Sequence, residues 1–196
     1  ISLGLVGSEM CIRDRYGYVN HLVLPPFYYK SVGDDGLYDY FSYMIKTINS
    51  ENLRIYLYHF PQVSMVPISV DLVLRLKNEF GSIIAGLKDS SGDFSQSVAF
   101  TTATGGINQD FDVYPSSEAF YFKGIQAGCA GIISGSTNVF ATLVQAAIKS
   151  PEGSESKEFK KVIEARSFAG EFNLMAAMKA ACSSTEALLE KSFIST

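Results

Sequence analysis

Lys88 is the side chain in this sequence best placed for covalent chemistry. It ends the apolar run Ile83–Leu87 and precedes a turn rich in serine, glycine and aspartate, Asp89–Asp93. Such a run before a turn predicts a strand buried on both faces of a parallel sheet. Partial desolvation at the strand end disfavours the ammonium form and favours the neutral amine that attacks carbonyl carbons. Lys88 is therefore a candidate Schiff-base former, and the alternative is a solvated lysine that marks where the strand reaches water.

Tyrosines and hydroxyls follow the ends of the other predicted strands. Carbinolamine chemistry needs protons moved to and from a carbonyl oxygen and an amine, which phenols beside a lysine can do. Tyr58 is the candidate for this role, although it could instead be a core aromatic with a satisfied hydroxyl. His59 points opposite to Tyr58 along a strand and is expected to pack rather than act. The remaining strand ends carry Phe27, Tyr28, Tyr29, Ser116, Ser117, Glu118 and Ser134–Asn138.

Strand and helix alternate along the chain five times, at a spacing of roughly 20 to 35 residues, which is the period of βαβ units. An open doubly wound sheet and a (β/α)8 barrel both fit, and both place the active site at the carboxyl ends of the strands. No glycine-rich phosphate loop follows a strand, which weakens a nucleotide-binding interpretation. Strands are predicted at 19–24, 55–60, 83–88, 111–114 and 131–134, and helices at 34–48, 69–80, from 93, 118–127, 140–149, 157–169 and 172–190.

The predicted fold class is therefore α/β, a partial (β/α)8 TIM barrel of about the last five βα units, followed by C-terminal helices. The domain prediction has three parts: a non-native segment at 1–15, the partial barrel at 16–150, and a helical region at 151–196. Residues 5–15 resemble the translation of a sequencing-library adapter and show neither signal-peptide character nor helix or strand periodicity. The three missing barrel units are expected to precede Tyr16.

Composition narrows the function further. Of 196 residues, 47% are hydrophobic and 18% charged, so a sizeable core is expected and wholesale disorder is excluded. The net charge of −4 argues against nucleic acid or an anionic membrane as the main partner, and no apolar run reaches membrane-spanning length. Three distant cysteines and two histidines support neither a disulfide framework nor a zinc cluster, so no metal is predicted and a reducing cytoplasm is the default location.

Four motifs carry a resemblance to a known family. They are Leu24–Lys30, Tyr56–Pro61, Gly86–Asp93 and Gly128–Ser134, which read LPPFYYK, YLYHFP, GLKDSSGD and GCAGIIS. In order and spacing they resemble the successive motifs of the dihydrodipicolinate synthase / N-acetylneuraminate lyase family of pyruvate-dependent class I aldolases. The resemblance runs from about Tyr16 to Lys179.

The resemblance implies roles for individual residues. Lys88 would form the Schiff base with pyruvate, so no separate cofactor is needed. Tyr58 matches the tyrosine of a Tyr-x-x-Pro motif that shuttles protons and contacts the substrate carboxylate. Tyr28 matches a loop tyrosine lent to the neighbouring subunit, in a family that usually forms tetramers of tight dimers, so a homo-oligomer is expected. Ile133 matches a residue whose main-chain carbonyl lies near the keto acid. The strand-end residues Ser116, Glu118 and Ser134 complete the predicted substrate-binding set.

Two departures from the family pattern limit the substrate assignment. The Thr-Thr segment that holds the pyruvate carboxylate is absent from this sequence. Dihydrodipicolinate synthases also carry an arginine two residues after the Tyr-x-x-Pro proline, where this chain has Val63. An apolar side chain cannot replace a bidentate guanidinium, which disfavours the lysine-pathway synthase.

The leading hypothesis is a Schiff-base aldolase or lyase that forms or cleaves a 2-oxo-3-deoxy sugar acid with pyruvate as the keto component. Its partners would be a small 2-oxo acid and an aldehyde. Two alternatives stay open. One is a 4-hydroxy-tetrahydrodipicolinate synthase or a related hydro-lyase on the same scaffold, because the fold does not fix the substrate. The other is an inactive barrel fragment with unpaired sheet edges.

Overall fold

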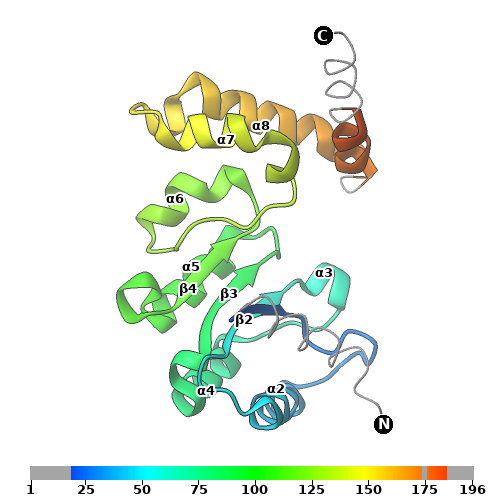
Figure 1. Cartoon of the computed structure of the whole chain (residues 1–196), viewed down its shortest axis with the longest axis vertical. Helices are drawn as coiled ribbons and strands as arrows, with labels where there is room; N and C mark the ends of the chain where they lie inside the picture. Colours follow the sequence, from blue (N-terminus) through cyan, green and yellow to red (C-terminus); the bar gives the residue numbers. More distant parts are fainter. Residues whose placement is uncertain (1–18, 174–175, 185–196) are drawn as a thin grey trace, which may run out of the picture. The chain divides into compact units, whose positions relative to one another are not determined.

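The computed structural model describes residues 19–173 and 176–184 (Figure 1). These residues form two compact units. The first contains residues 19–114 and 127–130, and the second contains residues 115–126 together with the described residues from 131 onward. The predicted non-native segment at 1–15 lies outside the described residues, and so does the end of the helix predicted over 172–190, of which residues 176–184 are helical.

The first unit is built on a sheet whose strands follow one another in chain order. The strands are β1 (Asn20–Val23), β2 (Arg54–His59), β3 (Ile84–Asp89) and β4 (Asp112–Pro115), in the order β1-β2-β3-β4. The pairs β1/β2 and β2/β3 are parallel. A doubly wound sheet reverses its strand order at a switch point, whereas a barrel wall keeps it. The chain-order sheet is thus part of a (β/α)8 barrel, as predicted.

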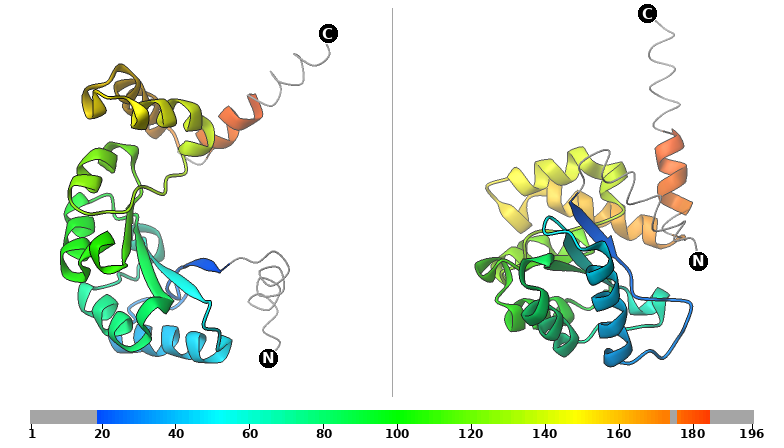
Figure 2. Two further views of the ribbon diagram at one scale, coloured as in Figure 1. Left: turned by 60° about the vertical axis from the view of Figure 1, so that its left-hand side comes forward. Right: turned by 60° about the horizontal axis from the view of Figure 1, so that its bottom comes forward.

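Helices α2 (Asp34–Ile48), α4 (Val70–Phe80) and α5 (Phe94–Thr104) connect these strands and cover one face of the sheet (Figure 2). Two predicted helix starts are confirmed. The hydroxyl of Ser69 accepts a hydrogen bond from the Leu72 N–H at 3.0 Å, and the carboxylate of Asp93 accepts one from the Ser95 N–H at 3.0 Å. The core between sheet and helices contains Leu37, Phe41, Ile55, Leu57, Leu72, Leu76, Ile84, Leu87 and Phe100.

Short helical turns complete the connections of the first unit. Helix α3 (Pro61–Ser64) begins two residues after the end of β2. It was not predicted from the sequence, because there Pro61 marks only the end of a strand. Proline is also favoured in the first turn of a helix, where its missing N–H costs nothing. The 3₁₀ helices η1 (Gly81–Ile83) and η2 (Gly106–Gln109) lead into β3 and towards β4.

The predicted fifth strand, Gly131–Ser134, is wrong, because this segment forms no strand. Two backbone hydrogen bonds nevertheless tie this stretch to β4: from the Ala130 N–H to the Val113 carbonyl (3.0 Å) and from the Ile133 N–H to the Pro115 carbonyl (3.1 Å). The donors are three residues apart and the acceptors two. This mismatch of one residue interrupts the regular ladder that a parallel strand requires.

The second unit is helical. It contains η3 (Glu118–Phe120), α6 (Tyr121–Gln126), α7 (Thr137–Lys149), η4 (Gly153–Glu155) and α8 (Lys157–Gly170). Helices α7 and α8 pack through Val144, Ala147 and Val162, with aromatic rings at the margin. Helix α7 starts before the predicted Phe140, whose non-helical backbone (φ −104°, ψ 20°) marks a kink. In neither unit does the described part of the chain contain a helix long and apolar enough to cross a membrane.

Candidate active site

Lys88 and Tyr58 lie side by side at the ends of neighbouring strands. They are register partners between β3 and β2, and both are half-buried. The Lys88 Nζ donates a hydrogen bond to the Tyr58 Oη at 3.2 Å and lies 4.3 Å from the centre of the Tyr58 ring. Because the phenol oxygen accepts this bond, its own proton is free for a ligand. The structure therefore brings together the two residues for which catalytic roles were inferred from the sequence.

Lys88 has no carboxylate partner among the residues that the structure describes, because none of their ion pairs involves it. The adjacent Asp89 is buried on the opposite face of the sheet. Its carboxylate accepts hydrogen bonds from the Ser91 N–H at 2.9 Å and from the Ser97 hydroxyl at 2.5 Å. The amine therefore faces a phenol rather than a counter-ion.

The chain that follows Tyr58 fixes the position of its ring. Phe60 stacks against it, with ring centres 5.7 Å apart and planes inclined by 20°. The Phe60 carbonyl then accepts a hydrogen bond from the Ser64 hydroxyl at 2.9 Å within the turn that Pro61 begins. The Tyr-x-x-Pro motif thus acts as a strand end that turns immediately into α3, and it holds the phenol beside Lys88.

His59 is buried on the other face of the sheet, as predicted. Its ring meets the edge of Phe100 from α5, with centres 5.4 Å apart. Its Nδ1 accepts a hydrogen bond from the Ile68 N–H at 3.1 Å, which places the ring proton on Nε2. Burial lowers the pKa of His59, and the negative charge of Asp89 opposes this shift only in part. The neutral imidazole is a packing group on the helix side of the sheet.

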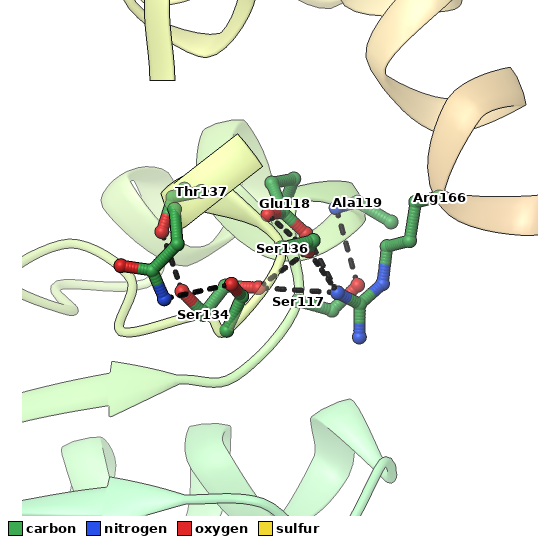
Figure 3. Close-up of polar contacts among 9 residues, drawn as sticks. Ser117, Glu118, Ala119, Ser134, Ser136, Thr137 and Arg166 are labelled. Atoms are coloured by element: carbon green, nitrogen blue, oxygen red, sulfur yellow. Dashed lines mark hydrogen bonds and ion pairs between the residues drawn. The ribbon is translucent and has the colours of Figure 1, made fainter. Parts of the chain in front are cut away.

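A second polar group, in the second unit, joins Glu118, Ser134, Ser136 and Arg166 (Figure 3). Glu118 is only 2% exposed, and its Oε2 lies 2.8 Å from the Nη1 of Arg166. The Ser136 hydroxyl donates to Glu118 Oε1 at 2.6 Å. The same guanidinium nitrogen donates to the hydroxyls of Ser136 (2.7 Å) and Ser134 (3.1 Å). Glu118 and Ser134, predicted to bind substrate, thus take part in an internal network.

Arg166 was missed by the sequence interpretation. It lies on α8 with Val162 one turn before it and Ala169 about one turn after it, and both of these neighbours are buried. An arginine at this spacing lies on the apolar face of its helix. That position was the available signal, because a charge on a buried face needs a partner of opposite sign.

The other predicted site residues have few contacts. Ser116 is half-buried, and Ile133 is 37% exposed with its N–H bonded to the Pro115 carbonyl at 3.1 Å. Tyr28 is 82% exposed, and its ring meets the edge of the Tyr29 ring, with centres 5.3 Å apart. The structure does not bring Tyr28 into contact with Lys88 or Tyr58.

No group of three or more metal-ligating side chains occurs within residues 19–173 and 176–184. Cys129 is buried, and its sulfur lies 3.4 Å from the Thr101 hydroxyl. Burial raises the pKa of this thiol, so it is suited to packing rather than to nucleophilic attack.

These observations define the class: a TIM-barrel protein with a lysine and a tyrosine paired at the ends of adjacent parallel strands. The chain matches the Dihydrodipicolinate synthetase family over residues 12–180, and it belongs to that family.

Three relatives illustrate the match. An uncharacterized DapA-like lyase of Chloroflexus aurantiacus is 31% identical over 125 residues, which cover 64% of this chain and 40% of that protein. A 2-dehydro-3-deoxy-D-gluconate/2-dehydro-3-deoxy-phosphogluconate aldolase of Picrophilus torridus is 27% identical over 137 residues, covering 70% and 48%. The crystal structure of dihydrodipicolinate synthase from Agrobacterium tumefaciens superimposes with a TM-score of 0.76 at 32% identity, covering 91% of this chain and 59% of that one. The chain thus spans about half the length of the proteins that it resembles.

Proposed function

We propose that this chain supplies the Schiff-base lysine and the acid–base tyrosine of a class I aldolase or lyase that uses pyruvate as its keto component. The contact between Lys88 Nζ and Tyr58 Oη, 3.2 Å long on one face of the sheet, carries the proposal. Membership of the family supports it. The covalent lysine takes the place of a cofactor, and the reaction takes place in the cytoplasm.

The proposed chemistry follows from these two side chains. The electron pair of the neutral Lys88 amine attacks the ketone carbon of pyruvate, and the carbonyl oxygen takes a proton. The nitrogen then loses a proton, the new hydroxyl takes one and leaves as water, and a protonated imine forms. Tyr58 carries protons between the amine and the oxygen, a role that its free phenolic proton suits. Loss of a proton from the methyl carbon gives an enamine. The enamine carbon adds to the carbonyl carbon of an aldehyde, whose oxygen takes a proton as the imine re-forms. Water then hydrolyses the imine, which releases the 2-oxo acid product and the Lys88 amine.

The proposed second substrate is a hydroxylated aldehyde that has no carboxylate in the part that would lie near Val63. Val63 lies on α3 and is 65% exposed. Its side chain is apolar, so it offers no hydrogen-bond donor to a carboxylate. The similarity to a sugar-acid aldolase of Picrophilus torridus supports this assignment. A second candidate is 4-hydroxy-tetrahydrodipicolinate synthase activity, which the 32% identity to the Agrobacterium tumefaciens synthase favours.

Exposed aromatic rings support the proposal that the enzyme is a homo-oligomer, a dimer or a tetramer. Phe27, Tyr28 and Tyr29 are 58%, 82% and 72% exposed, respectively, in one loop. Lys30 ties this loop to the end of α3 by a hydrogen bond of 3.1 Å to the Ser64 carbonyl, next to the exposed Met65. Large exposed apolar side chains gathered in one loop are typical of an interface.

Borohydride trapping tests the proposal. The protein from the complete reading frame is incubated with pyruvate, reduced, and digested, and the mass added to the peptide that contains Lys88 is measured. We expect the adduct on Lys88, its loss in Lys88→Ala, and its retention in Lys161→Ala, which replaces an exposed lysine of α8. Labelling that survives Lys88→Ala would overturn the assignment. A panel of aldehydes then identifies the second substrate, and the same assay on Tyr16–Thr196 alone tests the alternative of an inactive fragment.

A further inference from the structure

A third polar group lies on the same face of the sheet as Lys88 and was not part of the sequence interpretation. Tyr56 Oη donates a hydrogen bond to Asp112 Oδ2 at 2.9 Å, and Tyr114 Oη donates to the same oxygen at 3.5 Å. The rings of Tyr56 and Tyr114 are 6.0 Å apart, centre to centre. Since alternate residues of a strand share a face, Tyr56 lies on the face of Tyr58. These three residues are called the Asp112 bridge below.

The strand that carries Lys88 is irregular just before the lysine. Ile55 pairs with Ile84 and Tyr56 with Gly86, so β3 has one extra residue, Ala85, at this point. Such a bulge re-aims the side chains that follow it and is frequent beside active sites. Here it sets the pairing of Tyr58 with Lys88, two residues further along.

Gly86 is the residue that lets the Asp112 bridge cross β3. A Cβ at this position would lie 2.2 Å from the Asp112 carbonyl oxygen and 2.7 Å from the Tyr56 ring. No side chain fits there, so the phenol passes over the glycine and joins β2 to β4. The support that β3 lacks from a side chain of its own thus comes from Tyr56 and Asp112.

The two phenols of the Asp112 bridge act as hydrogen-bond donors at neutral pH and do not titrate there. Burial strongly raises the pKa of Tyr56, and the hydrogen bond and negative charge of Asp112 raise it further. Burial and the same carboxylate also raise the pKa of Tyr114. Both phenols therefore remain protonated and keep donating to Asp112.

We propose that Tyr56 and Asp112 are positioning residues for Lys88: with Tyr114 they hold β3 between its two neighbours, so that the lysine amine stays within hydrogen-bonding distance of Tyr58. The proposal rests on the proposed Schiff-base function. A displacement of the order of 1 Å in a reacting group can cost about a hundredfold in rate. The bulge and Gly86 leave this stretch of β3 open to such a displacement.

The test measures the rate of borohydride-trappable adduct formation with pyruvate in the full-length protein, together with kcat and KM for the aldehyde. We expect Tyr56→Phe, which keeps the ring over Gly86, and Asp112→Ala to slow adduct formation about ten- to a hundredfold, with little change in KM. Asp112→Asn keeps an acceptor oxygen and should recover part of the rate. Tyr43→Phe, at a tyrosine of α2 that is 72% exposed, is the matched control.

A purely structural role predicts a different result. Leu76 is a fully buried residue of α4 in the core between the sheet and the helices. Leu76→Ala should therefore lower the stability of the fold without changing the face of the sheet that carries Lys88. If it slows adduct formation as much as Tyr56→Phe at one temperature below both unfolding midpoints, the proposal is overturned. The same holds if Tyr56→Phe fails to unfold cooperatively, or if Tyr56→Phe and Asp112→Ala form the adduct at the wild-type rate. A wild-type protein that forms no adduct on Lys88 would instead refute the proposed function, and the positioning role with it.

Discussion

The Lys88–Tyr58 pair and the network around Glu118 each join an ionisable side chain to a hydroxyl group. They differ in how completely that side chain is matched by partners. Lys88 is half-buried, donates one hydrogen bond of 3.2 Å, and has no carboxylate partner in the described chain. Glu118 is almost fully buried and is matched by a guanidinium at 2.8 Å and a serine hydroxyl at 2.6 Å. Two hydroxyls share the same guanidinium nitrogen with this carboxylate.

The difference between them separates groups that can react from groups that hold structure. A buried ion pair has lost the solvation of both charges, and its mutual attraction and hydrogen bonds offset that cost only while every partner is in place. Binding a substrate would remove partners from Glu118. Lys88 has no carboxylate partner among the described residues and Tyr58 keeps a phenolic proton to donate, so a substrate adds partners instead. The predicted substrate contacts of Glu118, Ser134 and Ser116 stay predictions.

The largest expected effect comes from Tyr58→Phe, which removes the hydroxyl and almost no volume. A positioned acid–base group typically contributes about 10²- to 10⁴-fold in rate, so turnover with pyruvate and the aldehyde should fall by that factor while the unfolding midpoint changes little. Steady-state kinetics and thermal unfolding of the full-length variant measure both, with Tyr43→Phe as the matched control. Wild-type turnover in Tyr58→Phe would show that the tyrosine only packs.

Arg166→Ala should mainly affect stability, because it leaves the buried Glu118 carboxylate without its counter-charge. Breaking a buried pair from one side typically costs about 3–5 kcal/mol of unfolding free energy. The double variant Glu118→Gln/Arg166→Met should be less destabilised than the sum of the single changes, since both charges are gone. Lys160→Ala breaks an exposed pair, 3.5 Å from Glu155, and should cost about 1 kcal/mol or less. Denaturant unfolding of the protein measures these three variants and the single changes Glu118→Gln and Arg166→Met. Equal costs for Arg166→Ala and Lys160→Ala would contradict the structural role.

Val63→Arg tests whether the reactive region lacks a cation. The new guanidinium should raise kcat/KM for aspartate semialdehyde relative to a neutral hydroxyaldehyde by about ten- to a hundredfold, the equivalent of roughly 1.5–3 kcal/mol for a charge-assisted contact. Ile107→Arg adds the same charge at another exposed apolar position, 47% accessible, and is the control. A wild-type protein that already prefers the semialdehyde would show that another cation holds the carboxylate.

Local sequence signals were sufficient for most of the longer helices and for the pairing of Lys88 with Tyr58. Apolar periodicity and the caps Ser69 and Asp93 mark helix faces and starts within a few residues. The pairing of Lys88 with Tyr58 follows from two general rules, namely that parallel strands end at one edge and that alternate residues share a face. These rules need no knowledge of distant contacts.

The features that were missed depend on contacts between distant residues. Arg166 and Glu118 are 48 residues apart, and Tyr56 and Asp112 are 56 apart, so no local pattern links them. The segment Gly131–Ser134 has the composition of a strand, and only the one-residue mismatch in its hydrogen bonds to β4 shows that it is not one. A sequence window predicts burial and period but not the partner of a polar side chain.

The smallest expected effect concerns His59, which neighbours Tyr58 in sequence but faces the other side of the sheet. Burial is the largest cause of the shift that lowers the pKa of His59 below its ordinary value of about 6.5. Just below that pH the folded state therefore binds fewer protons than the unfolded state. The stability that the neutral ring contributes is present above pH 6.5 and is lost as the pH falls towards the folded-state pKa. The unfolding free energy should therefore decrease as the pH falls below about 6.5, by at most about 1.4 kcal/mol per pH unit for one group.

His59→Asn should flatten this decrease, because an asparagine oxygen can accept the Ile68 N–H bond without titrating. His21→Asn, at a half-buried histidine of β1, is the matched control and should leave the decrease in place. Urea unfolding at a series of pH values measures the slope, and the pyruvate adduct rate is followed in parallel. If His59 belongs with the structural groups, His59→Asn changes the slope and not the adduct rate. The reverse result, an unchanged slope with a slowed adduct rate, would move His59 to the reactive side of the comparison, because it would mean that the imidazole influences Lys88 across the sheet.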